Sequence, residues 1–72
     1  MGSMQDRIMA EAVRMGGEFT TADMAMAIWG SIKRNRMSHV FIILAKLARW
    51  GDIERVGRKN VDGSLMMVWR VV

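Results

Sequence analysis

The most informative part of this chain is Met37–Arg58, with the sequence MSHVFIILAKLARWGDIERVGR. In its first half, Val40 marks the centre of an apolar stripe. Leu44 lies within about 60° of it on a helix that turns about 100° per residue. Gly51 supplies a stop for that helix, and Ile53 opens a basic segment in which apolar and charged residues alternate. The stretch therefore predicts an amphipathic helix that leads directly into a β-strand.

Two further helices are predicted upstream. The first spans about Met4–Met15, where apolar residues recur at helical spacing, and Gly16 stops it. The second runs from its cap, Thr20, to about Trp29, with Asp23 at the acidic position of a capping box.

The third helix is expected to follow a polar, basic connector. Gly30–Arg36 forms that connector, and Ser38 is expected to be the N-cap of a helix that reaches Arg49. Trp50 is expected to close the helix by packing between it and the strands that follow.

The C-terminal part of the chain predicts a β-hairpin. Its first strand begins at Ile53, its second strand covers Leu65–Val72, and the turn lies within Asn60–Ser64, where Asp62–Gly63 favours positive φ. The alternation in the second strand places Trp69 on the face toward the core. The predicted fold class is α+β, mainly α: three helices and a C-terminal two-stranded hairpin. We expect a single domain over 4–72, and Met1–Ser3 resembles a cloning remnant.

The composition excludes several classes of function. The chain has no Cys and one His, and it shows no Gly-rich phosphate loop, catalytic triad or cluster of metal ligands. We therefore expect no enzymatic activity, no cofactor and no metal. The longest uncharged apolar run, Val40–Ala45, is far shorter than the roughly 20 residues that a bilayer requires, so no membrane partner is expected. The lack of Cys suits a reducing cytoplasm.

The net charge of +4 is modest, but its distribution is uneven. The cationic residues concentrate between Lys33 and Arg70, whereas the N-terminal part is nearly neutral. This asymmetry is consistent with one face that meets a polyanion, and equally with an ordinary solvated basic surface.

Two motifs resemble those of the winged helix-turn-helix superfamily of DNA-binding regulators. The pattern L-x-x-L-x-x-x-G-x-I-x-R of residues 44–55 is similar to the junction between a recognition helix and a wing, and Gly17–Ala25 is similar to the start of the first helix of the helix-turn-helix. The resemblance covers the chain from Ile8 onward. It implies a small transcriptional regulator, similar in size to those of phages, plasmids and prokaryotic operons, that binds double-stranded DNA sequence-specifically.

The resemblance also assigns roles to ten residues. It puts the third helix in the major groove and the hairpin on the flanking backbone. The residues expected to face the bases are Ser38, His39, Ile42, Lys46 and Arg49. The residues expected to hold phosphates are Lys33, Arg34, Arg36, Arg58 and Lys59.

One feature of the third helix supports a different reading. Phe41 and Ile42 fall on or beside its expected DNA face, and an exposed apolar pair fits a protein interface as well as thymine methyl groups. The alternative is a winged-helix module that binds another protein through this surface. A homodimer is also compatible with the sequence, with Met4, Met9 and Val13 of the first helix as its contact face.

Overall fold

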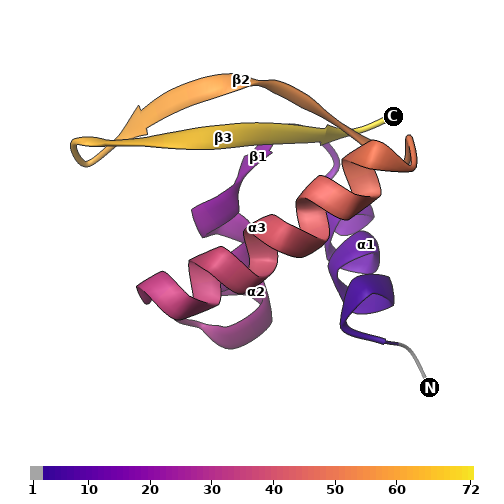
Figure 1. Cartoon of the computed structure of the whole chain (residues 1–72), viewed down its shortest axis with the longest axis horizontal. Coiled ribbons are helices and arrows are strands. Elements are labelled where there is room, and N and C mark those ends of the chain that lie inside the picture. The colour runs from indigo at the N-terminus through magenta and orange to yellow at the C-terminus, as the bar shows by residue number, and fades with distance from the viewer. Residues whose placement is uncertain (1–2) are drawn as a thin grey trace.

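The computed structural model describes residues 3–72 and contains three helices and one antiparallel sheet (Figure 1). Met1 and Gly2, two of the three residues expected to be a cloning remnant, lie outside the described residues. The elements, in chain order, are α1 (Met4–Met15), β1 (Phe19–Thr20), α2 (Thr21–Trp29), α3 (Arg34–Arg49), β2 (Ile53–Val61) and β3 (Ser64–Val71). The sheet has the order β1-β3-β2. The predicted layout, three helices and a C-terminal hairpin wing, is confirmed.

The first two helices begin with the same chemistry. Ser3 caps α1. Its hydroxyl oxygen accepts a hydrogen bond from the backbone N–H of Asp6, and the Asp6 carboxylate accepts one from the backbone N–H of Ser3. Thr20 and Asp23 form the same capping box at the start of α2, as predicted. Each box satisfies N–H groups that the first turn of a helix leaves without partners.

The third helix begins about one turn earlier than predicted. The N-cap of α3 is Lys33, and Ser38 lies within the helix, so the expectation that Ser38 is the cap was wrong. Ser38 was predicted because serine is a common N-cap, whereas the actual N-cap, Lys33, makes no side-chain capping hydrogen bond. Instead, Asn35 Oδ1 accepts from the N–H of Arg36 at 2.9 Å, and the N–H of Met37 bonds to the carbonyl of Lys33. The α2–α3 connection is correspondingly shorter than the predicted connector.

The core lies between the three helices and the face of the sheet that carries Trp69. Its fully buried large side chains are Trp69, Ile8, Met24, Leu44, Leu47, Ile53 and Val40. Trp69 also donates a hydrogen bond from Nε1 to Thr21 Oγ1 at 3.0 Å, which satisfies the one polar atom of a buried indole. The prediction that the Trp69 face is buried is confirmed.

A two-residue strand, β1, was not predicted. Phe19 pairs with Trp69 and Thr20 with Val68, so β1 adds a third strand beside β3. Two residues are too few to show a strand periodicity, and a contact with a strand about fifty residues away leaves no local signal.

The hairpin of β2 and β3 forms the wing. Its two-residue turn, Asp62–Gly63, has positive φ at both positions, 49° and 83°, as a type I′ turn requires. Val56 is a β-bulge, because Arg55 pairs with Trp69 while the residue after Val56 pairs with Val68. In Figure 1 the turn of the hairpin and the N-terminal end of α3 lie at the same end of the long axis.

Trp50 is the C-cap of α3, so it closes the helix as expected, but its side chain does not pack between α3 and the hairpin. Its side chain is 58% exposed. The space between α3 and the hairpin is filled by Ile53 and Trp69, which are buried, so the indole of Trp50 is left on the surface. Within residues 3–72, the structure contains no helix with the length and apolarity needed to cross a membrane.

Candidate nucleic-acid interface

The third helix packs on two sides and leaves a third side free. On one side, His39 and Arg36 contact Trp29 of α2. On the other, Phe41 contacts Trp69 of β3, with ring centroids 5.6 Å apart in an edge-on arrangement. At about 100° per residue, the direction between these two contacts points into solvent. Five exposed residues lie on that outward face: Asn35, Ser38, Ile42, Lys46 and Arg49.

The α2 side of this face is ordered by an aromatic ring. The guanidinium carbon of Arg36 lies 5.0 Å from the centroid of the Trp29 ring, and the His39 ring lies 5.5 Å from it. Stacking of this kind holds a guanidinium in place while leaving its N–H groups free to donate. Arg36 and His39 therefore flank the outward face and remain exposed.

The sheet side is ordered by a second stack, centred on Arg55. Its guanidinium carbon lies 5.5 Å from the Trp69 centroid and 5.9 Å from the Phe41 centroid. Sequence reasoning did not assign Arg55 to the site, because only the fold brings the start of β2 against the middle of α3. Phe41, at 38% exposure, is partly covered by these contacts and is less free than Ile42, at 60%.

A groove runs between α3 and the start of β2. Lys46 and Arg49 of α3 and Arg55 of β2 contribute to its lining. Glu54 also lines it, but its carboxylate accepts hydrogen bonds from Arg70, the residue opposite it on β3. Three cations therefore line the groove, and the carboxylate of Glu54 beside them is paired with Arg70.

The bulge at Val56 determines which wing cations face α3. Residues directly opposite in an antiparallel pair project from the same face of the sheet. Arg55 is paired with Trp69 and Arg58 with Met67, so both arginines share the face toward α3. Lys59 is paired with Met66 and projects from the other face. Without the extra residue, simple alternation would have put Lys59 on the face that Arg58 occupies.

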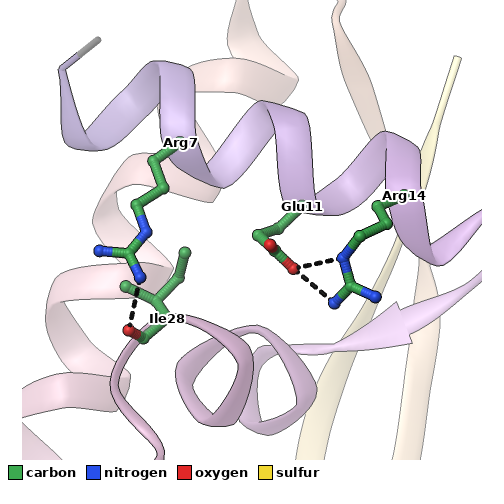
Figure 2. Close-up of polar contacts among 4 residues, drawn as sticks. All are labelled: Arg7, Glu11, Arg14 and Ile28. Carbon is green, nitrogen blue, oxygen red and sulfur yellow. Dashed lines mark hydrogen bonds and ion pairs between the residues drawn. The ribbon is translucent and has the colours of Figure 1, made fainter. Parts of the chain in front are cut away.

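The cations of α1, by contrast, are engaged within the protein (Figure 2). Arg14 forms an ion pair with Glu11, and its hydrogen bond lowers the pKa of the Glu11 carboxyl. Arg7 donates to the carbonyl oxygen of Ile28 at 3.1 Å. On the sheet, Arg70 is engaged in the same way: its hydrogen bond to Glu54 raises the pKa of the Arg70 guanidinium.

The third helix has no acidic residue at all, since none occurs between Asp23 and Asp52. Among residues 3–72, the two ion pairs are Arg14–Glu11 and Arg70–Glu54, and neither involves α3. The positive charge of α3 and of the facing side of the wing is thus not neutralised internally.

The ten predicted site residues are all exposed, but they do not lie together on one continuous surface. One hollow on the N-terminal half of α3 is lined by Arg34, Asn35, Ser38, His39 and Ile42. Lys46 and Arg49 meet Arg55 in the groove described above. Lys33 lies at the start of the helix, and Lys59 lies on the far face of the wing. Asn35 was missed because the predicted helix began after it.

Two other features were considered from the sequence, a metal site and a dimer face on α1, and the described residues form neither of them clearly. Among residues 3–72, no group of three or more His, Cys, Asp or Glu side chains is placed to hold a metal ion. Of the three residues considered for a dimer face, Met4 and Met9 pack against the core, and only Val13 is largely exposed.

Comparison of the chain with protein-family models, with curated proteins and with solved structures finds no match.

Proposed function

We propose that the protein binds duplex DNA sequence-specifically, with α3 in the major groove and the wing along the flanking backbone, as a small transcriptional regulator in the cytoplasm. The observation that supports this most is the unneutralised charge of α3. Its outward face has no acid, and cations border it on both sides. A duplex presents a dense array of phosphates on both sides of each groove, which matches that arrangement.

The dimensions of α3 suit this role. The helix has 16 residues and is about 24 Å long, and the major groove of B-DNA is about 12 Å wide and admits one α-helix. With the outward face toward the bases, Ser38, Ile42 and Arg49 would approach base edges. Arg36, held on Trp29, would approach one backbone, and Arg55, held on the other side of α3, would approach the other.

The salt dependence of binding tests this proposal. The cations best placed for phosphates are Lys33, Arg34, Arg36, Arg55 and Arg58. Five such contacts predict a slope of log K against log salt of roughly −4 to −5, at about −0.9 per contact. Fluorescence anisotropy with a labelled duplex of mixed sequence, about 24 base pairs long, measures the slope. Affinity that does not change with salt would contradict the proposal.

A second candidate function is supported by one observation. A groove between α3 and β3 is lined mainly by apolar residues, among them Met37, Ile42 and Leu65, which is 68% exposed. Exposed apolar surface of this kind is typical of a site that binds another protein. A protein-binding module would use this groove and show little affinity for DNA. The salt titration separates the two functions.

A further inference from the structure

Ile42 has a distinctive place on the outward face of α3. It is 60% exposed, and it lines the hollow at the N-terminal half of the helix as well as both grooves beside the hairpin. Ser38 lies about one turn before it, and Ala45 lies about one turn after it on the same side. The other two neighbours at this spacing, His39 and Lys46, are polar, so Ile42 is the most exposed large apolar side chain of α3.

In a major groove, such a side chain has one favourable partner. The edges of guanine, cytosine and adenine present hydrogen-bonding groups but no methyl group there, whereas thymine presents its C5 methyl group beside an acceptor oxygen. An isoleucine pressed against a hydrogen-bonding edge would remove water from polar atoms without replacing their hydrogen bonds. Against a thymine methyl, the same contact buries apolar surface on both partners.

We propose that Ile42 selects duplexes that place a thymine methyl group beneath the centre of α3. This inference rests on the proposed function, since it requires α3 to enter the major groove, and it adds the chemical identity of one base in the target. The exposed cations can hold any duplex, because phosphate contacts carry no sequence information, so Ile42 supplies discrimination that they cannot.

The test compares thymine with uracil, which lacks only the methyl group. A preferred duplex is first selected with the wild-type protein from a pool of random sequences about 24 base pairs long. Each thymine in it is then replaced singly by uracil. At one or two positions we expect the wild-type protein to lose about fourfold in affinity, the effect of one buried methyl group. Ile42→Ala should bind the thymine duplex more weakly and be indifferent to uracil at those positions.

Val13→Ala is the matched control. Val13 has the same exposure as Ile42 but lies on α1, so this variant should retain the thymine preference. Thermal unfolding of all three proteins shows whether each variant folds, which is expected because both side chains are largely exposed.

The inference is overturned if the selected duplex is bound but every uracil replacement is neutral, or if Ile42→Ala remains as sensitive to uracil as the wild type. In both cases the proposed function stands. If no duplex is bound at all, or no preferred sequence emerges, the sequence-specific function itself fails and the inference fails with it.

Discussion

At the scale of single residues, Trp69 connects the sheet to the helices. Its buried ring contacts Phe41 of α3 and donates its indole N–H to Thr21 of α2, and its backbone lies opposite Phe19 in the β1–β3 pairing. The residue therefore links the wing to the helix that the proposed function uses. The bond from Trp69 Nε1 to Thr21 Oγ1 supplies a buried side-chain hydrogen bond to that link.

The Trp69–Thr21 hydrogen bond gives the first prediction. Thr21→Val keeps the shape of the side chain but leaves a buried indole N–H without a partner, which should cost about 1–3 kcal/mol of unfolding free energy. The urea unfolding midpoint measures this loss. Thr21→Ser keeps the hydroxyl and is the control, with a smaller loss expected. Equal stability of Thr21→Val and the wild type would show that the hydrogen bond contributes nothing.

Single-residue predictions from sequence succeeded where a residue's environment depends on its own helix. Val40, Leu44 and Leu47 are buried as the periodicity of α3 predicts. Arg55 was not assigned to the site, and the packing of Trp50 was predicted wrongly, because the environments of both residues depend on contacts between elements. Arg55 is held by rings of α3 and β3, and Trp50 is exposed because Ile53 and Trp69 fill the space assigned to it.

At the scale of elements, the three helices differ in how they begin. α1 and α2 start with complete capping boxes, whereas α3 starts with Lys33 and carries Arg34 and Arg36 in its first turn. Cations near a helix N-terminus oppose the helix dipole, so this start is less stable than it could be. Local chemistry that disfavours the fold is expected where a site has another use, and here the proposed use is to hold phosphate. The missing cap also explains why sequence reasoning misplaced the start of α3.

The start of α3 gives the second prediction. Lys33→Ser introduces a capping hydroxyl and removes a cation from the positive end of the dipole, so it should stabilise the protein by about 0.5–1 kcal/mol. The same change removes one phosphate contact and should make the salt slope shallower by about 0.9. Urea unfolding and the anisotropy titration measure the two effects. Thr20→Ala, which removes the working cap of α2, is the control and should destabilise by about 1 kcal/mol.

A Lys33→Ser variant that is no more stable than the wild type would show that α3 has no capping deficit. A variant that is more stable and binds DNA with an unchanged slope would show that Lys33 contacts no phosphate.

The wing gives the third prediction. The bulge at Val56 puts Arg58 on the face toward α3 and Lys59 on the opposite face. Both are exposed cations next to each other in the chain, so they form a matched pair. Arg58→Ala should weaken duplex binding clearly more than Lys59→Ala, with neither changing the sequence preference. Anisotropy at fixed salt measures the difference. A larger effect of Lys59→Ala would mean that the far face of the wing meets the DNA.

The type I′ turn and the second strand of the wing could be predicted, because the Asp62–Gly63 pair and the alternation around Trp69 are local signals. The bulge could not. One extra residue reverses the facing of every side chain beyond it, and its position is fixed by pairing with β3 and not by local composition.

At the scale of the whole molecule, the cations of α3 lie on an element without acidic residues, whereas the ion pairs lie on α1 and on the sheet. Glu11 of α1 pairs with Arg14 on the same helix and Glu54 of β2 pairs with Arg70 on the adjacent strand, while α3 has no acidic residue. The order of the three helices and the hairpin was predictable because Gly16, Gly30 and Gly51 follow the helix ends and Asp62–Gly63 marks the turn. The candidate site was predictable only in part, since the residues of α3 could be named from one helix but their neighbours from the wing could not.

The most direct test of the proposed function is a map of amide chemical shifts in isotope-labelled protein titrated with an unlabelled duplex of mixed sequence. DNA binding through α3 and the wing predicts shifts concentrated at Ser38, Ile42, Lys46 and Arg58, with the side of α1 that carries Glu11 unaffected. No shifts at low salt, or shifts centred on α1, would contradict it.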